Sequence, residues 1–430
     1  MSDSDSMAQA MKMQNIPIAK PWIGEPEAEA ARRAIMSGWV TQGPEVAGFE
    51  QEFAAYVGAK YACAVSNCTT ALHLALLAVG VQPEDQVITV SHSYIATANS
   101  IRYCGAIPVF VDIEPQTYNI NPVLIEDVIN ERTRAILIVH QMGMPCDLKA
   151  ILAIAKRYNL PVIEDAACAT GSEILWDGQW EKIGKPHGDI ACFSFHPRKV
   201  ITTGDGGMIT TNNPAWDQQF RLWRQHGMSV PDTVRHGSKQ VIFETYPMLG
   251  YNYRMTDIQA AVGREQLKRL PEIVERRRYL AQRYHHQLAD ILGLKLPTEP
   301  TWAKSNWQSY CVYLPDQCNQ RQVMQAMLDA GISTRRGITC AHREPAYQIE
   351  AWSCGVAREN CDCSQKYCDS YGALRYRLSK SEKAQDDAIL LPLFHQMNEQ
   401  EQDLVVNELK VACQSNPDIE IQNQYIVWRH

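Results

Sequence analysis

AILIVHQMGMPCDLKAILAIAKRYNLPVIED, residues 135–165, decides the fold class of this chain. The stretch opens on one apolar run, AILIVH, and closes on another, PVIED. Between them, DLKAILAIAKRYN has the apolar spacing of an amphipathic helix. Apolar runs that end on a polar residue are typical of strands buried on both faces, as in a parallel sheet covered by helices. The stretch therefore predicts two parallel strands joined by a helix.

The same alternation predicts a seven-stranded, mainly parallel sheet that belongs to an α/β domain. The expected strands are residues 61–65, 86–90, 108–112, 135–140, 161–165, 190–195 and 207–211. Helical patterns such as TTALHLALLAVG and NPVLIEDVIN separate them. Ligands of such sheets bind at the carboxyl ends of the strands, so polar residues that follow strands are the first candidates for a site.

The remainder of the chain predicts a second, smaller α/β domain. A charged helical pattern with a bend near Pro271 leads out of the large domain over residues 267–289. A strand is expected at 308–314, and helices are expected at 321–330 and 399–412. We divide the 430 residues into a flexible lead-in (1–20), a large domain (21–270) and a small domain (271–430).

Composition and charge exclude several functional classes. A net charge of −7 gives no basic field for nucleic acid or an anionic membrane, so neither partner is expected. No apolar run approaches the ~20 residues that span a bilayer, and the polar start lacks the apolar core of a secretory signal. Cysteines inside apolar runs, such as Cys63, Cys104, Cys192 and Cys311, indicate buried thiols in a reducing compartment. We therefore expect a cytoplasmic protein.

A local group of cysteines stands apart from these. Cys354, Cys361, Cys363 and Cys368 lie in the irregular stretch 340–375. Their spacing lacks the paired pattern of common zinc sites. A loop of free thiols is favoured over a structural metal, so no metal site is predicted.

Lys199 is the first candidate for chemistry. In DIACFSFHPRKVITTGDGGMITT, residues 189–211, it lies just beyond an apolar strand and before a loop of small residues. A lysine whose pKa is lowered by its surroundings can attack an aldehyde and form a Schiff base. Glycines in TTGDGG allow the backbone to approach a ligand closely. The segment alone leaves open a surface lysine before a turn.

Two further segments complete a site around such a lysine. Asp165 ends a buried strand in VIEDAACATG, where a carboxylate needs a cationic partner such as a protonated pyridine nitrogen. A helix cap or a salt bridge is the alternative. In SNCTTALHLAL the first free N–H groups of a helix, near Thr69 and Thr70, offer a phosphate site. Capping by Asn67 or Thr69 is the alternative there.

Together these segments resemble the DegT-type sugar aminotransferases, of the fold-type I class of pyridoxal 5′-phosphate (PLP) enzymes. The matching stretches are WVTQGPEVAGFEQEFA, SNCTTALHLAL, SYIATANSI, PVFVDIEPQTYNI, EDAACATG, DIACFSFHPRKVITTGDGG and GYNYRMTDIQAA. They run from about residue 22 to residue 278, and weaker similarity follows in SEKAQDDAILLPLFHQM. The resemblance implies an aspartate aminotransferase-like fold and PLP as the cofactor.

The resemblance also implies roles for the candidates above. Lys199 is expected to form the Schiff base with PLP and to shuttle the proton during the reaction. Asp165 is expected to pair with the pyridine nitrogen. Thr69 and Thr70, together with Ser194, are expected to hold the phosphate.

Other matched positions concern the rim of the site and the subunit interface. Tyr94 occupies the position of an aromatic ring that stacks on PLP in this family. Asn252, in GYNYRM, matches a residue that reaches the phosphate of the neighbouring subunit, which implies a homodimer with shared sites. Cys168 stands where many members carry Gln or His near the cofactor's 3-hydroxyl, and a thiol is a weaker hydrogen-bond partner. Histidines 140, 196 and 226 are expected to be structural.

The implied reaction moves an amino group from glutamate or glutamine to a keto sugar that is nucleotide-linked. A cyclitol ketone is the alternative acceptor. A PLP-dependent sugar dehydratase is disfavoured, because that branch of the family has histidine in place of the lysine. A non-catalytic regulatory protein on the same fold is expected to have lost Lys199 or Asp165, or to carry a DNA-binding segment, and the sequence shows neither change.

Overall fold

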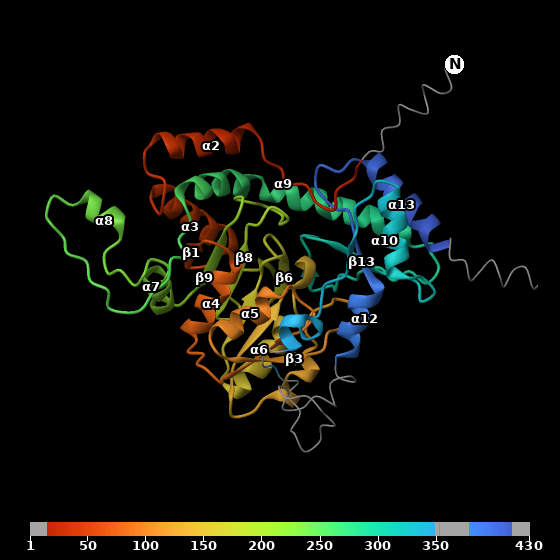
Figure 1. Cartoon of the computed structure of the whole chain (residues 1–430), viewed down its shortest axis with the longest axis horizontal. Coiled ribbons are helices and arrows are strands. Elements are labelled where there is room, and N and C mark those ends of the chain that lie inside the picture. Colours follow the sequence, from red (N-terminus) through yellow and green to blue (C-terminus); the bar gives the residue numbers. More distant parts are fainter. Residues whose placement is uncertain (1–14, 349–351, 353–377, 415–430) are drawn as a thin grey trace, which may run out of the picture.

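A seven-stranded sheet forms the centre of the protein in the computed structural model, which describes residues 15–348, 352 and 378–414 (Figure 1). Its strands lie in the order β1-β9-β8-β5-β4-β2-β3. Their bounds are β1 Tyr61–Val65, β2 Gln86–Val90, β3 Ile107–Val111, β4 Thr133–Val139, β5 Val162–Asp165, β8 Ile190–Ser194 and β9 Gly207–Thr211. Only β9 runs antiparallel to its neighbours. The predicted, mainly parallel sheet is confirmed, and β1, β2 and β9 have the predicted bounds.

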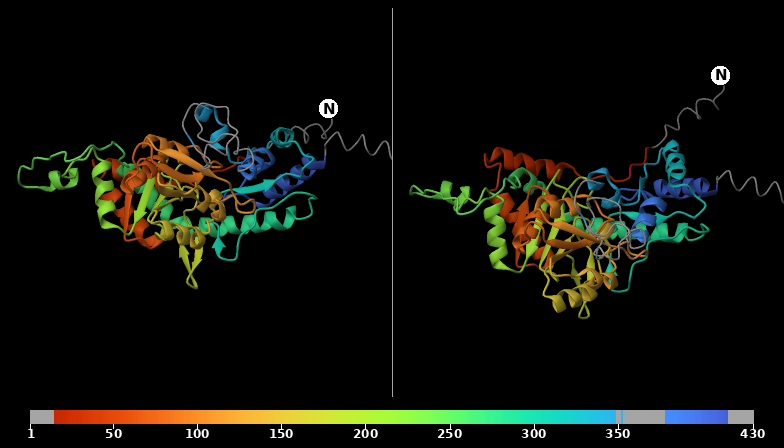
Figure 2. Two further views of the ribbon diagram at one scale, coloured as in Figure 1. Left: turned by 90° about the horizontal axis from the view of Figure 1, so that it is seen from below. Right: turned by 60° about the horizontal axis from the view of Figure 1, so that its bottom comes forward.

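Helices cover the sheet and fix where its strands end (Figure 2). Those that follow strands are α4 Cys68–Ala78, α5 Ala96–Tyr103, α6 Leu148–Tyr158 and α7 Pro214–Trp223. The side chain of Asp147 caps α6 by accepting the N–H of Ala150 at 3.1 Å. Asn159 ends the helix in the left-handed conformation, with a φ of 53°. Polar residues at both ends of an apolar pattern therefore give α6 its predicted position.

One long helix, α9 (Asp257–Leu288), runs through both parts of the chain (Figure 1). The pattern predicts a helix from residue 267 that bends near Pro271, but the structure has one 32-residue helix with Pro271 inside it. Proline removes one backbone hydrogen bond at that point. Leu270 and Ile273 on either side are completely buried, and their packing offsets this loss. The sequence also predicts a helix over residues 256–267, and the structure joins the two predicted helices into one.

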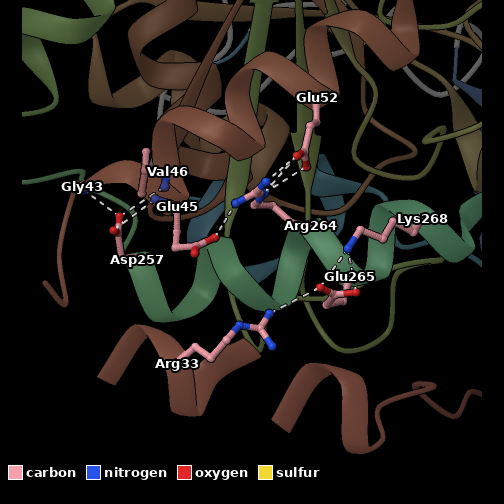
Figure 3. A network of polar contacts seen from close by, with 9 residues as sticks. All are labelled: Arg33, Gly43, Glu45, Val46, Glu52, Asp257, Arg264, Glu265 and Lys268. Atoms are coloured by element: carbon pink, nitrogen blue, oxygen red, sulfur yellow. Dashed lines mark hydrogen bonds and ion pairs between the residues drawn. The ribbon is translucent and has the colours of Figure 1, made fainter. Parts of the chain in front are cut away.

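The first turns of α9 and of α3 (Pro44–Val57) are held together by a buried carboxylate (Figure 3). Asp257 is completely buried and accepts the N–H of Gly43 at 2.6 Å. Arg264 adds ion pairs with Glu45 at 2.7 Å and Glu52 at 2.6 Å, but these side chains are partly exposed. The buried hydrogen bond to Asp257 therefore contributes more than the ion pairs to this contact. Helix α2 (Glu25–Met36) packs along the same half of α9.

The C-terminal part has its own core around a three-stranded antiparallel sheet, β11-β13-β12. Its elements are β11 Tyr310–Tyr313, β12 Arg335–Arg336, β13 Ala388–Leu391, α10 Gln320–Asp329, α12 Ser379–Asp387 and α13 Glu399–Gln414. The strand and two helices that the sequence predicts here are present, whereas β12 and β13 were not predicted. A further small sheet combines β6 Glu173–Trp176, β7 Gln179–Lys182 and β10 Ala303–Lys304.

The predicted division into domains remains a prediction. Leu280 and Tyr284, from the second half of α9, lie in the C-terminal core, so the helix crosses the proposed boundary at residue 270. Ile16, which the division assigns to the lead-in, is completely buried in the same core and bridges to Ile332. The described part of the lead-in is thus packed against the small domain.

The four cysteines of the 340–375 stretch, Cys354, Cys361, Cys363 and Cys368, lie outside the described residues. Among residues 15–348, 352 and 378–414, no three His, Cys, Asp or Glu side chains gather as a metal site requires. No helix within these ranges combines the length and apolar character needed to cross a membrane.

A buried histidine makes the stability of the fold depend on pH. His395 is 7% exposed, lies against Trp22 with a tilted ring, and has no hydrogen-bond partner on either ring nitrogen in the described part of the chain. Burial, followed by the charges of Arg277 and Arg269, lowers its pKa to about 4. An unfolded histidine has a pKa of about 6.5, so the unfolded chain binds more protons between these two values. Stability from this group is therefore present above pH ~6.5 and is lost as the pH falls towards 4.

We expect His395→Leu to remove this acid sensitivity. Protonation of His395 should lower the unfolding free energy of the wild-type protein by about 2 kcal/mol between pH 7 and pH 5. The variant lacks this group and should not show this loss. Urea unfolding at both pH values measures the difference. His286→Leu, an exposed position on α9, is the control and should behave as the wild type does. An unchanged pH dependence in His395→Leu would show that the ring is not held neutral.

Candidate active site

Asp165 and Lys199 meet at the carboxyl edge of the central sheet. Asp165 is the last residue of β5, and Lys199 follows β8, which pairs with β5 in parallel. The turn after Asp165 carries Cys168, whose Sγ accepts a hydrogen bond from Lys199 Nζ at 3.1 Å. The two segments that the sequence singles out for a lysine and a carboxylate are therefore neighbours in the fold.

Groups of the protein alone keep the Lys199 amine charged. Burial lowers the pKa of the amine, but the sulfur of Cys168 and the carboxylate of Asp165 outweigh burial and leave that pKa above its ordinary value. This direction is opposite to the lowered pKa that Schiff-base formation favours. A positive charge placed against Asp165 would neutralise the carboxylate and weaken its hold on the proton of the amine.

The Asp165 carboxylate is buried without an ion pair. It is 5% exposed, and within the described part of the chain the charge of Lys199 acts on it without a salt bridge. Oδ2 accepts the hydroxyl of Thr97 at 2.8 Å, and Oδ1 accepts the N–H of Ala167 at 3.1 Å. Burial nevertheless raises the pKa of this carboxyl. Neither a salt bridge nor a helix cap therefore accounts for Asp165, and a bound cation is the partner that a buried carboxylate lacks here.

Thr97 is a site residue that sequence reasoning missed. It lies on α5, is almost completely buried, and receives a second polar contact from Ser93 Oγ at 2.8 Å. The two hydroxyls thus extend from the loop after β2 to Asp165. Thr97 belongs to the matched stretch SYIATANSI, but one sequence does not distinguish its hydroxyl from that of any threonine near a helix start. The sheet order identifies it. Only β4 lies between β2 and β5, so the helix that follows β2 begins close to the end of β5.

The N-terminus of α4, where the sequence predicts an anion site, follows β1. Asn67 caps the helix and accepts the N–H of Thr70 at 2.9 Å, so that donor is already used. The Thr70 hydroxyl donates to the carbonyl of Asn67 at 2.8 Å. Thr69 has no such partner for its N–H or hydroxyl among the described residues. Of the predicted pair, Thr69 therefore keeps its donors available for an anion, in the positive end of the helix dipole.

Ser194 and Tyr94 border the same edge of the sheet. Ser194 ends β8 and is 7% exposed, and its hydroxyl accepts only a long 3.4 Å contact from the N–H of His196. Tyr94 lies between β2 and α5 and is 70% exposed, so one face of its ring is available to a ligand or another chain.

Asn252 makes no contact with Lys199 or Asp165 in the described part of its own chain. It is exposed and accepts a hydrogen bond from Arg254 Nε at 3.1 Å. The carbonyl of the next residue, Tyr253, accepts the N–H of Ser66 at 2.8 Å. The loop therefore borders the start of α4, while the Asn252 side chain is exposed.

The completely buried His140 is a satisfied structural residue, as the sequence predicts. Its Nδ1 accepts the N–H of Cys146 at 3.0 Å, and its Nε2 lies 3.0 Å from Glu164 Oε2. Both ring nitrogens of His140 therefore have partners within the protein.

Comparison with known proteins finds a matching family, similar sequences and similar solved structures. The family described as DegT/DnrJ/EryC1/StrS aminotransferase matches residues 21–369. GDP-perosamine synthase from Caulobacter vibrioides is 40% identical over 339 residues, which are 77% of this chain and 86% of that protein. The solved structure of the aminotransferase TlmJ from Streptoalloteichus hindustanus is 29% identical, with a TM-score of 0.79 over 92% of this chain and 98% of its own. The PLP-form of a putative sugar aminotransferase, Spr1654 from Streptococcus pneumoniae, is 25% identical, with a TM-score of 0.79 over 93% and 99%.

A comparison of two buried aspartates at strand ends, Asp165 and Asp112, tests whether Asp165 lacks a cationic partner. Asp112, just after β3, accepts the N–H groups of Lys380 and Ser381 at 2.9 and 2.8 Å, and so is satisfied. Asp165→Asn should stabilise the protein without ligand by about 1 kcal/mol, since it removes a buried charge whose pKa is raised. Asp112→Asn should destabilise it by a similar amount. Urea unfolding at pH 7 measures both, and equal losses would mean that the protein itself satisfies Asp165.

Proposed function

The chain is a member of the DegT/DnrJ/EryC1/StrS aminotransferase family, and from this membership we propose a PLP-dependent transfer of an amino group from glutamate or glutamine to a nucleotide-linked keto sugar. The observation that carries the proposal is the contact of Lys199 with Cys168 beside the unpaired Asp165 carboxylate. A lysine amine and a buried carboxylate at one edge of a parallel sheet fit the two ends of a pyridine aldehyde.

The residues at this edge fit PLP by charge. Asp165 supplies the negative charge that a protonated pyridine nitrogen requires, and Thr97 orients that carboxylate. Thr69 and Ser194 offer donors for the phosphate. When bound, PLP supplies an electron sink through which an amino group passes from donor to acceptor. Lys199 Nζ is the group that takes up and returns the proton, and neutralisation of Asp165 lowers the pKa of its amine towards that task.

The class of acceptor that we propose is taken from the name of a similar protein. GDP-perosamine synthase, at 40% identity, is named for a nucleotide-linked amino sugar. A nucleotide-linked keto sugar is accordingly the acceptor class that we propose for this chain. A panel of such sugars, each incubated with the PLP-loaded enzyme and glutamate or glutamine, identifies both substrates by the amino sugar that forms.

We also propose a homodimer in which Asn252 completes the site of the partner. Residues 229–250 leave the body of the protein as an arm that carries α8 (Asp232–Gly237) (Figure 1, Figure 2). Val241, Phe243 and Leu249 on this arm are 84, 88 and 84% exposed. Apolar side chains on a projecting segment favour burial against another chain, and the arm ends directly before Asn252. Free cysteines throughout the described part are in keeping with the reducing cytoplasm as its location.

Lys199→Ala tests the proposed role of the lysine. The variant should lose the visible absorption band of lysine-linked PLP and at least about a thousandfold in amino transfer, because no other described amine lies beside Asp165. Lys268→Ala, at an exposed position on α9, is the control and should keep both. Absorbance with and without glutamate, together with amino-sugar formation, provides the measurement. Persistence of the band and of turnover in Lys199→Ala would refute the proposed function.

Mixed subunits test the shared site. In a dimer of one Lys199→Ala and one Asn252→Ala subunit, one site carries both lesions and the other carries neither. Up to about half of the mixed sites are therefore intact, and activity should rise above that of either parent. The measurement is turnover after subunit exchange, which native mass spectrometry verifies.

The outcome separates action in trans from action in cis. If Asn252 acts within its own chain, every mixed dimer has one lesion in each site and mixing restores nothing. A Lys199→Ala plus Lys199→Ala mixture is the control for the exchange procedure. Lack of recovery with an impaired Asn252→Ala parent and verified exchange would overturn the shared-site geometry.

A further inference from the structure

A short segment from the small domain reaches beneath the candidate site. Residues 305–309 connect β10 to β11, and Asn306 among them is completely buried. Asn306 Nδ2 donates to the carbonyls of Cys168 and Thr170, each at 2.8 Å. Its Oδ1 accepts the N–H of Gln308 at 2.8 Å. The side-chain amide of Asn306 thus donates its hydrogen bonds to the Cys168 turn and accepts one from its own segment.

Gln308 holds the other loop of the site. Its Nε2 donates to the carbonyl of Arg198 at 2.6 Å, directly before Lys199. Gln308 is 8% exposed, and its Oε1 has no hydrogen-bond partner in the described part of the chain. Two residues of one segment therefore hold the two loops whose side chains, Cys168 and Lys199, touch each other at 3.1 Å.

The segment is itself fixed by a buried arginine of α9. Arg277 is 4% exposed and donates to the carbonyls of Trp307 at 2.9 Å, Gln308 at 2.7 Å and Leu393 at 3.0 Å. Burial lowers its pKa to about 10, so the guanidinium is still charged at neutral pH. Trp307 adopts a left-handed conformation with a φ of 51°, which is unfavourable for a bulky residue and is maintained here by these bonds.

We propose that Asn306 and Gln308 are positioning residues that set the Lys199 amine against Cys168 and Asp165. The proposal rests on the proposed function in taking Lys199 as the lysine that binds PLP. Neither residue touches the amine; each acts through a backbone carbonyl of the loop that it holds. Because proton transfer is sensitive to displacements of about 1 Å, release of either loop should lower kcat more than it changes KM.

Asn119 provides a matched control for Asn306. It is 2% exposed, its Nδ2 donates to the carbonyls of Met144 and Pro145 at 3.0 and 2.8 Å, and its Oδ1 accepts the N–H of Gln141 at 2.8 Å. The two asparagines therefore make the same kinds of hydrogen bond in equal number. Asn306→Ala and Asn119→Ala should lose similar stability, but only the first should disturb Lys199.

The expected result is a difference between these variants in the PLP-loaded enzyme. Asn306→Ala should lower kcat about tenfold with KM for the amino donor within about twofold, and should shift the pH midpoint of the lysine-linked absorption band by about half a unit. Asn119→Ala should leave both readouts near the wild-type values. Equal changes in the two variants would overturn the proposal, since they would reflect stability alone.

Gln308 keeps the test decisive if Asn306→Ala does not fold. Gln308→Ala removes a single hydrogen bond, and Gln308→Glu keeps the shape while removing the donor. Gln320, whose Nε2 donates to the carbonyls of Gln385 and Ala388 at 2.9 and 2.7 Å, is the control within the same domain. Both Gln308 variants should lower kcat several-fold and shift the band midpoint, while Gln320→Ala should not. Unchanged kcat and midpoint in Gln308→Ala would overturn the proposal.

A readout without PLP separates failure of this proposal from failure of the proposed function. In the protein without cofactor, alkylation of Cys168 by iodoacetamide is followed by mass spectrometry. Asn306→Ala should accelerate it about threefold over Asn119→Ala, because the turn that carries the thiol is released. A failed proposed function appears instead as PLP binding that does not depend on Lys199. If Cys168 reacts equally fast in both asparagine variants, the positioning proposal is wrong whatever Lys199 binds.

Discussion

The unpaired charge of Asp165 is the constraint on which the rest of the site depends. A carboxylate that is 5% exposed and has no ion pair in the described part of the chain opposes folding unless something else contributes positive charge. Lys199 supplies part of that charge, and the hydroxyl of Thr97 supplies a hydrogen bond. A cationic ligand at this strand end would relieve the cost of the buried charge. Such a charge costs stability in the empty protein and becomes favourable when the ligand binds.

The two parts of the chain both contribute to this arrangement. The central sheet brings Asp165 and Lys199 to one edge, and the loops that follow β5 and β8 carry Cys168 and Lys199. Asn306 and Gln308 from the small domain restrain both loops. Arg277 in turn restrains that segment from α9, the helix that spans both cores. The geometry at Lys199 is therefore a property of the whole fold rather than of the sheet alone.

The sequence predicts the sheet and the lysine–carboxylate pair for a clear physical reason. Continuous apolar runs mark buried strands, and the order of chain segments along a parallel sheet requires their carboxyl ends to share one edge. Local signals also predict the helix from Asp147 to Asn159. Another local signal was overlooked: Asp177-Gly178, with φ values of 48° and 83°, forms the turn of the β6–β7 hairpin.

Long-range contacts set the limit of such prediction. Thr97, Asn306 and Gln308 lie far from Asp165 and Lys199 in the sequence, and each acts through a single hydrogen bond or pair of bonds that leaves no periodic pattern. The joining of the two predicted helices into one continuous α9 is aided by burial of Leu270 and Ile273 beside Pro271, which local propensity does not contain. Residues that perform chemistry are thus recognisable from their type and place after a strand, whereas residues that position them become recognisable only from the fold.

The raised pKa of Lys199 shows how residues that position a group can also affect its chemistry. In the protein alone, Cys168 and Asp165 hold the amine in its charged form. A ligand that brings positive charge to Asp165 would weaken one of these influences. In the protein alone, the contact of Lys199 with Cys168 joins a side chain on the β8 loop to one on the β5 turn. With Asn306 and Gln308 positioning these two loops, as we propose, the small domain influences the charge of Lys199 without touching it.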